Sequence, residues 1–295
     1  MKIGVNYPYV LKKIYGEKGG LTTLKNAGFD AVDYSLDVGF KPACQPTLDN
    51  DEQIFEFYRD VRRHMDEIGI FCSQTHAPMF PNQSEEDSYS PEKVEMYKRA
   101  IRVSAILGAK YIVIHPTTFG VLSSEYLKGK NATKKLYDML TDTLVECDVK
   151  LGVENMFTYD YKHYYYCSTT CSDAVELLEH VDMMNSDRYC VCLDVGHASV
   201  VGLDPIKVIH HVAPKLELLH VHDTFCAYDS HCIPGECTTI WPDVIRALKE
   251  VGYKGVFSME LATFGRAAAI DKSILDDYIV IAAKVARYLV DEYYK

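Results

Sequence analysis

Histidines and carboxylates that could do chemistry are concentrated in the segment Leu218–Glu236, LLHVHDTFCAYDSHCIPGE, which contains no Lys or Arg. His220 and His222 are two residues apart, so on a strand both side chains point to the same face. Asp229 and His231 follow in a D-x-H arrangement. Crowded imidazoles and carboxylates are costly without positive charge among them, so these residue types indicate a divalent metal site. For this segment taken alone, a polar loop with incidental histidines is the alternative interpretation.

The elements that would position these residues follow a repeated order along the chain. Four times a helical pattern ends at a glycine, the residue typical of the left-handed position that closes a helix. Each time a run of β-branched or aromatic residues begins within a few positions. The glycines are Gly28, Gly69, Gly108 and Gly252. The pattern predicts helix, tight turn and strand, four times over.

Similar runs complete a set of eight expected strands, most of them almost continuously apolar, as strands buried on both faces should be. They are Lys2–Asn6, Ala31–Tyr34, Ile70–Thr75, Tyr111–His115, Leu151–Glu154, Cys190–Asp194, Glu217–His222 and Val256–Glu260. Helical patterns separate them. These helices are expected around Thr22–Ala27 and at Glu52–Glu67, Pro91–Leu107, Asn131–Cys147, Ser172–Val181, Pro205–His211, Trp241–Val251 and Asp271–Tyr294.

Eight alternating β and α units without a break in composition predict an α/β fold, a single (β/α)8 TIM barrel domain over residues 1–295. The alternative is an open doubly wound sheet, which would need a glycine-rich phosphate turn after the first strand. The sequence there, Asn6-Tyr7-Pro8-Tyr9, has no such turn.

In such a barrel the active site is built at the carboxyl ends of the strands. Six consecutive expected strands end in residue types that bind metals. Glu154 and Glu260 are set in apolar strands, where a buried charge must be paired or coordinated. The strand ends and the loops that follow them carry His76, His115, Glu154, Asp194, His197, His220, His222, Asp229, His231 and Glu260. One histidine at a strand end is more often structural, but this set taken together indicates a metal centre.

Short sequences at these positions carry a resemblance to a known family. They are THAP at 75–78, IHP at 114–116, VEN at 153–155, LDVGH at 193–197, HVHD at 220–223, DSHCIPGE at 229–236 and MEL at 259–261. With them the chain resembles the xylose-isomerase-like TIM barrels, which include sugar isomerases and epimerases and the endonuclease IV group. The resemblance to the sugar epimerases implies one metal held by Glu154, Asp194, His220 and Glu260, with the two glutamates moving the proton. His220 is preferred over His222 because Asp223 completes the family's H-x-x-[D/E] pattern.

The endonuclease IV group implies a larger cluster, in which all nine metal-ligand types have a counterpart here. His76, His115, His197, Asp229 and His231 join the four residues above. The alternative function is therefore metal-dependent phosphodiester hydrolysis at abasic DNA. However, APMF follows His76, MFTYD follows Asn155, and DVGH stands where that group has DTCH. The net charge of −11 also weighs against a partner rich in phosphate.

We therefore expect a metal-dependent isomerase or epimerase of a small sugar or related polyhydroxy carbonyl compound. The mixed oxygen and nitrogen ligands suit Mn²⁺, Zn²⁺, Co²⁺ or Mg²⁺, and the nine-residue match predicts more than one ion. A barrel that only binds a metal or a sugar is a third hypothesis, which the paired glutamates argue against. His222 and Arg266 are candidate substrate-binding residues. The few cations in the last loops favour an unphosphorylated substrate.

The remaining features of the sequence concern a lid or subunit contact and the location of the protein in the cell. The tyrosine-rich segment Thr158–Cys171 is either a lid over the substrate or a surface loop that contacts another subunit in a homo-oligomer. The sequence has no long apolar run, no signal peptide at its start and no CxxC pair among its ten cysteines. We therefore expect a reduced, cytoplasmic protein that does not enter a membrane.

Overall fold

Eight parallel strands form a closed barrel in the computed structural model, which describes residues 1–36, 50–79, 84–120, 123–225 and 228–294. The strands are β1 (Ile3–Tyr7), β2 (Ala31–Ser35), β3 (Phe71–His76), β4 (Tyr111–Val113), β5 (Lys150–Glu154), β8 (Tyr189–Asp194), β9 (Leu216–His220) and β10 (Phe257–Met259). Their order is β10-β1-β2-β3-β4-β5-β8-β9. Val221 closes the ring between β9 and β10, because its N–H donates to Ser258 O (2.9 Å) and its carbonyl accepts from Glu260 N (3.0 Å). The predicted (β/α)8 TIM barrel is confirmed.

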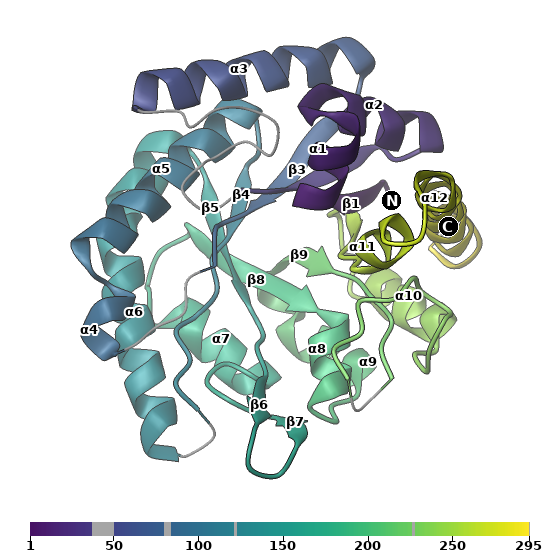
Figure 1. Cartoon of the computed structure of the whole chain (residues 1–295). Coiled ribbons are helices and arrows are strands. Elements are labelled where there is room, and N and C mark those ends of the chain that lie inside the picture. The colour runs from purple at the N-terminus through teal and green to yellow at the C-terminus, as the bar shows by residue number, and fades with distance from the viewer. Residues whose placement is uncertain (37–49, 80–83, 121–122, 226–227, 295) are drawn as a thin grey trace.

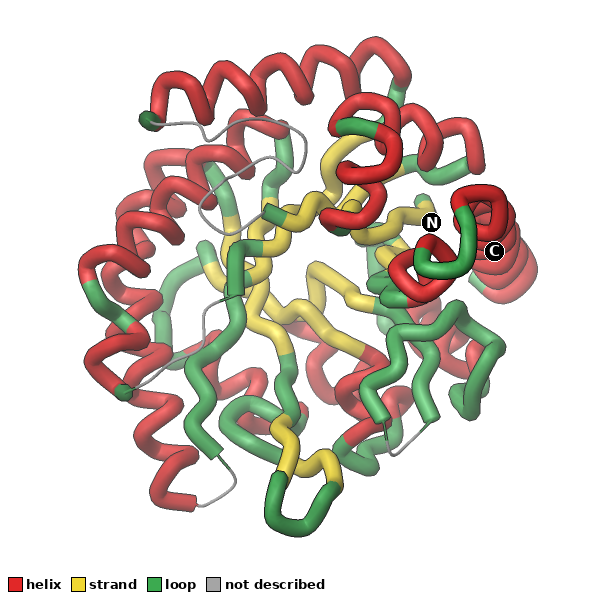
Figure 2. The backbone as a smooth tube through the Cα atoms, in the orientation of Figure 1, coloured by secondary structure: helices red, strands yellow, loops and turns green. Residues whose placement is uncertain are grey.

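Helices surround the barrel as an outer ring (Figures 1 and 2). They are α1 (Tyr9–Tyr15), α2 (Glu17–Ala27), α3 (Asp51–Ile68), α4 (Glu85–Ser88), α5 (Pro91–Leu107), α6 (Ser123–Cys147), α7 (Ala174–Asp182), α8 (Val195–Val200), α9 (Pro205–Val212), α10 (Trp241–Glu250), α11 (Thr263–Ala268) and α12 (Lys272–Tyr293). A short 3₁₀ turn, Ala213–Lys215, precedes β9. None of the described helices is both long and apolar enough to cross a membrane.

The structure contains the glycine turns that the sequence predicts at the ends of helices. Gly28, Gly69 and Gly108 each close a helix with positive φ (110°, 72° and 78°), and each N–H returns to the last turn of its helix. A residue with a side chain is strained in that conformation. The sharp turn at each glycine ends the helix and leads the chain into the next strand.

The structure adds three short helices to those expected, α4, α8 and α11, and three other regions differ from the sequence prediction. The first crossover contains two helices, α1 and α2, separated at Gly16 (φ 75°), rather than one helix near Thr22–Ala27. Helix α6 starts eight residues before the predicted Asn131. The tyrosine-rich segment contains an antiparallel hairpin, β6 (Thr158–Asp160) and β7 (Tyr165–Cys167), which projects from the barrel in Figure 1. Strands of three residues are too short to show a clear alternation in sequence.

Candidate metal and active site

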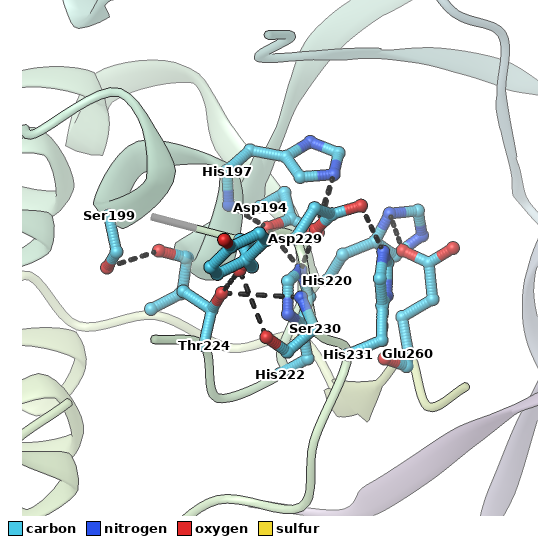
Figure 3. A network of polar contacts seen from close by, with 12 residues as sticks. Asp194, His197, Ser199, His220, His222, Thr224, Asp229, Ser230, His231 and Glu260 are labelled. Atoms are coloured by element: carbon cyan, nitrogen blue, oxygen red, sulfur yellow. Dashed lines mark hydrogen bonds and ion pairs between the residues drawn. The ribbon is translucent and has the colours of Figure 1, made fainter. Parts of the chain in front are cut away.

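The predicted ligand residues lie at the carboxyl ends of the strands or in the loops that follow, as the barrel rule requires. His76, Glu154, Asp194 and His220 are the last residues of β3, β5, β8 and β9. The rest come shortly after a strand end: His115 after β4, His197 on α8, His222, Asp229 and His231 after β9, and Glu260 after β10. Figure 3 shows Asp194, His220 and Glu260, from the ends of β8 and β9 and from just after β10, converging. The structure thus brings together residues that are up to 184 positions apart, His76 and Glu260.

The central group consists of Glu154, Asp194, His220 and Glu260, each of which offers a ligand atom within 4.8 Å of the others. Nδ1 of His220 lies 3.0 Å from Glu154 Oε1 and 3.2 Å from Glu260 Oε2. Glu154, Asp194 and His220 are almost completely buried, while the Glu260 side chain is 24% exposed. One side of this group therefore opens toward the barrel mouth.

A second group joins the central one through Glu154. Nε2 of His115 lies 3.1 Å from Glu154 Oε2, and Nε2 of His76 lies 3.0 Å from Nε2 of His115. The other nitrogen of His76, Nδ1, lies 2.9 Å from Ala77 O, which orients the ring. These three residues also meet the distance criterion for a metal site.

A third group, His197, His222, Asp229 and His231, lies on the side of the loop after β9. Asp229 is its centre: Oδ2 is 2.9 Å from His231 Nε2, and Oδ1 is 3.8 Å from His197 Nε2 and 3.6 Å from His222 Nε2. His231 has a left-handed backbone (φ 44°), which is uncommon for a residue with a side chain. Its Nδ1 lies 3.0 Å from Glu260 O, so the loop is held against the end of β10.

Asn155 connects two of these groups through the main chain. Its amide accepts from Asp194 N (2.7 Å) and donates to Asp194 O (2.9 Å), which ties β5 to β8. The carbonyl of Asn155 lies 2.9 Å from Nδ1 of His197. Asp194 in turn caps α8 by accepting from His197 N (2.6 Å). Asn155 of the VEN sequence therefore positions the candidate ligands Asp194 and His197 of the LDVGH sequence.

Asp223, which was used above only to select His220, has a structural role. Its two oxygens accept from the N–H groups of Thr224 (3.0 Å), Gly235 (2.8 Å), Cys237 (3.0 Å) and Thr239 (3.1 Å). Burial raises the pKa of Asp223, but the backbone hydrogen bonds from Cys237, Gly235 and Thr239 outweigh it, so the pKa is lowered. An ionised Asp223 thus organises the loop that carries Asp229 and His231.

One buried carboxylate at the site was not expected from the sequence. Asp33, in the middle of β2, is 1% exposed, and its Oδ2 lies 2.8 Å from Nε2 of His220. Gln74 of β3 donates to the same oxygen (3.0 Å). Asp33 could not be recognised as a site residue from the sequence, because it lies inside an apolar strand rather than at its end.

The carboxylates of the site are paired with histidines. Among the described residues, the ion pairs of Glu154, Asp194, Asp229 and Glu260 are all with histidine. Burial raises the pKa of Glu154 and Glu260, but the neighbouring imidazolium charges, His220 foremost, bring the pKa of each below its usual value. Burial lowers the pKa of His76 and His231, but their carboxylate partners raise these pKa values to about 9 and about 10. Burial dominates at His115, whose pKa is lowered.

The donor set fits a divalent metal ion. Glu154 Oε2, Asp194 Oδ2, Asp229 Oδ1 and both ring nitrogens of His222 are buried and have no hydrogen bond within the described structure. Buried polar atoms normally have partners. Oxygen and imidazole ligands that face one another without partners are what Zn²⁺, Mn²⁺ and related ions require.

Arg266 lies against the loop and not among the ligand groups. Its guanidinium donates to Ser230 O (2.9 Å), His231 O (3.5 Å) and Thr263 Oγ1 (2.9 Å). His222, the other candidate for binding substrate, is completely buried and belongs to the third group. Contact of either residue with a substrate stays a prediction.

Aromatic residues connect the tyrosine-rich hairpin to the site. The Phe157 ring meets His197 edge to face (4.7 Å between centroids), and Tyr166 meets Phe157 (5.1 Å) and Tyr228 (6.3 Å). At the hairpin tip, Tyr161 and Tyr164 are about four-fifths exposed. The hairpin therefore has an inner aromatic side beside His197, and the choice between a lid and a subunit contact stays open.

Of two cavities in the structure, one adjoins the candidate ligand residues and the other lies away from them. A cavity of about 90 Å³ lies beside His76 and His115. A larger one, about 500 Å³, lies near the start of β3, β4 and β9, where its acidic lining residue Glu217 is already paired with Lys150 (2.7 Å) and Tyr111 (2.9 Å). We place the chemistry at the smaller cavity, because the unpartnered ligand atoms are at that end.

Comparison with known proteins shows which family this chain belongs to. D-psicose 3-epimerase from Enterocloster bolteae is 23% identical over 268 residues, which cover 88% of this chain and 82% of that protein. A probable endonuclease 4 from Mycoplasmopsis agalactiae is 27% identical over 172 residues, 53% of this chain and 55% of that protein. The crystal structure of the IOLI protein with a bound zinc atom superimposes with a TM-score of 0.73 at 19% identity and covers all of both chains. The model of the family described as xylose isomerase-like TIM barrel matches residues 21–276, and the chain belongs to that family.

Proposed function

We propose that this protein is a divalent-metal-dependent epimerase or isomerase of a sugar, in which Glu154 and Glu260 move the proton. The observation that carries the proposal is their placement. Two glutamates from β5 and the end of β10 approach the same nitrogen, His220 Nδ1, at 3.0 and 3.2 Å. The similarity to D-psicose 3-epimerase over most of the chain supports a sugar as substrate.

Glu154, Asp194, His220 and Glu260 would hold the central ion. When bound, a divalent ion supplies positive charge that stabilises the negative charge developing on the substrate's carbonyl oxygen as a neighbouring C–H loses its proton. The residues supply the rest: three buried ligands fix the geometry, and Glu260 faces the accessible side.

The two glutamates have the roles of base and acid. One accepts the proton from the substrate carbon, and the other gives a proton that it has taken up from a neighbouring histidine to the opposite face or to the adjacent carbon. The histidines around them hold both pKa values below the usual range, so both glutamates are ionised at neutral pH before they react and either can act as the base. The 24% exposure of Glu260 lets its proton exchange with water.

The second candidate is phosphodiester hydrolysis at abasic DNA. It is favoured by the three adjoining ligand groups, which include all nine residues expected for a multinuclear centre. The net charge of −11 and the aromatic segment after Asn155 weigh against it. We place it second.

The test measures hydrogen exchange directly. The metal-loaded enzyme is incubated in D₂O with a panel of ketohexoses that includes D-psicose and D-fructose, and deuterium at carbon is followed by NMR. We expect exchange with at least one sugar and its loss in Glu260→Gln. Glu217→Gln is the matched control, because Glu217 lies at the opposite end of β9 and pairs with Lys150. Cleavage of an abasic-site oligonucleotide without hydrogen exchange in any sugar would instead favour the hydrolase.

A further inference from the structure

We propose that Asp33 is a positioning residue for the metal centre, acting through His220. In this role Asp33 holds the hydrogen of the imidazole on Nε2, so that Nδ1 presents its lone pair to the central ion. The inference rests on the proposed role of His220 as a ligand. No predicted ligand came from β2, and this assignment gives that strand a part in the site.

The geometry places the imidazole between two sets of carboxylates. On one edge Nε2 lies 2.8 Å from Asp33 Oδ2. On the other edge Nδ1 lies 3.0 Å from Glu154 and 3.2 Å from Glu260. Only the Nδ1 edge has ligand partners for an ion, so the ring must be oriented with this edge inward.

Asp33 can impose that orientation because its carboxylate only accepts hydrogen bonds when ionised. A carboxylate facing one ring nitrogen holds a hydrogen there, so an ion that displaces a proton from the ring would displace it from Nδ1, whose lone pair then faces the ion. Metal-bound histidines are commonly held in this way by a carboxylate, which fixes the ring and makes it a better ligand.

The surroundings of Asp33 show that it needs this partner. It is 1% exposed, and Gln74, also 1% exposed, is a neutral donor that cannot compensate its charge. The other oxygen, Oδ1, has no hydrogen bond among the described residues. A buried carboxylate of this kind is costly unless a positive unit lies beside it. His220 with a bound ion is such a unit.

The competing explanation is that Asp33 only fastens β2 to β9 across the barrel interior. The two explanations differ in what Asp33→Asn changes. If Asp33 positions the ligand, Mn²⁺ or Zn²⁺ binding to the otherwise folded apo protein weakens about 10- to 100-fold, the range seen for such partners. If it only fastens strands, stability falls and metal affinity does not.

Two controls separate these outcomes. Gln74→Met removes a hydrogen bond from the same network but leaves the Asp33 charge, and we expect its Mn²⁺ affinity to stay within about threefold of the unsubstituted protein, well short of the tenfold loss expected for a removed partner. Asp30→Asn removes one charge near the start of β2, where Asp30 pairs with Arg287 at the surface (2.7 Å). Its affinity should be unchanged.

Nitrogen-15 NMR of histidine-labelled, Zn²⁺-loaded protein gives a readout that strand fastening would not move. The His220 signals, assigned by their loss in His220→Gln, should show hydrogen on Nε2 and none on Nδ1 in the unsubstituted protein, and a weakened Nε2–H hydrogen bond in Asp33→Asn. Unchanged Mn²⁺ and Zn²⁺ affinity in folded Asp33→Asn would overturn the inference, and so would hydrogen on Nδ1 in the Zn²⁺-loaded unsubstituted protein. If the unsubstituted protein bound neither ion, the proposed function itself would fail, so the two failures are distinguishable.

Discussion

The imidazole rings of His222 and His231 stack face to face, with centroids 3.9 Å apart and planes inclined by 17°. His222 comes from the end of the barrel wall and His231 from the loop, so the stack joins the loop to the barrel. Gly196 makes room for it: a Cβ added there would lie 2.0 Å from Cε1 of His222. A glycine in the LDVGH sequence therefore sets the position of a histidine in the third ligand group.

We expect Gly196→Ala to displace His222 and to destabilise the protein by about 1–3 kcal/mol, the range for an overpacked interior. Chemical denaturation of the apo protein measures this change. Gly265→Ala is the matched control, because Gly265 also lies in a short helix but an added Cβ there meets nothing within 4 Å. Equal stability of the two variants would show that His222 moves aside without cost.

The central ion should depend on the two most enclosed carboxylates. Glu154→Gln and Asp194→Asn each replace a buried charged ligand with a neutral amide, so protein purified without chelator should lose at least one tightly bound divalent ion in each case. Elemental analysis measures the content. Glu217→Gln, a carboxylate paired with Lys150 away from the site, should retain the full content. Full occupancy in both ligand variants would be incompatible with the central site.

Metal binding should release protons, and its affinity should rise with pH. In the apo protein the pKa values of His76 and His231 are raised to about 9 and about 10, so both rings carry protons at pH 7.5. A histidine must lose its proton to bind a metal. Affinity should therefore increase from pH 6.5 and level off above pH 9 to 10. Titration calorimetry in buffers of different ionisation enthalpy counts the protons, and a count of zero at pH 7.5 would contradict this account.

The same shifts give the sign of the stability change without metal. Because the folded-state pKa values lie above the usual histidine value of about 6.5, the histidine–carboxylate pairs stabilise the apo protein fully below pH 6.5. This contribution is lost as the pH rises through 9 to 10. A bound ion replaces the protons, so the metal-loaded protein should lose less stability than the apo protein over the same range.

Much of this centre could be predicted from sequence because a parallel barrel brings its strand ends together wherever they occur in the chain. Glu154 and Glu260 were recognisable as polar residues closing apolar strands. Asp33 was not, since a carboxylate in the middle of β2 gains its role only from His220, 187 positions away. Asp223 matched a family pattern, yet its four backbone hydrogen bonds depend on the folded loop. Local pattern shows which strand ends meet, but not which buried partners orient their side chains.

The last prediction concerns the number of ions. His197, His222, Asp229 and His231 offer ligand atoms within 4.8 Å of one another, in a group separate from the central four. Asp229 Oδ1 and the His222 ring nitrogens have no hydrogen bonds within the described structure. These observations favour a second ion on the loop side over a loop whose histidines only bind sugar hydroxyl groups. We expect titration of apo protein to reach more than one ion per chain.

His231→Ala and Asp229→Ala should each lower the stoichiometry by one while the central ion is retained, because neither residue belongs to the central group. Asp160 and His163 provide the matched control: they form a similar carboxylate–histidine pair (2.8 Å), but in the hairpin loop, where His163 is exposed. His163→Ala should leave the ion count unchanged. If the count also stayed unchanged in His231→Ala and Asp229→Ala, the loop residues would contact the substrate instead. The sugar affinity of the two variants would then fall without any loss of metal.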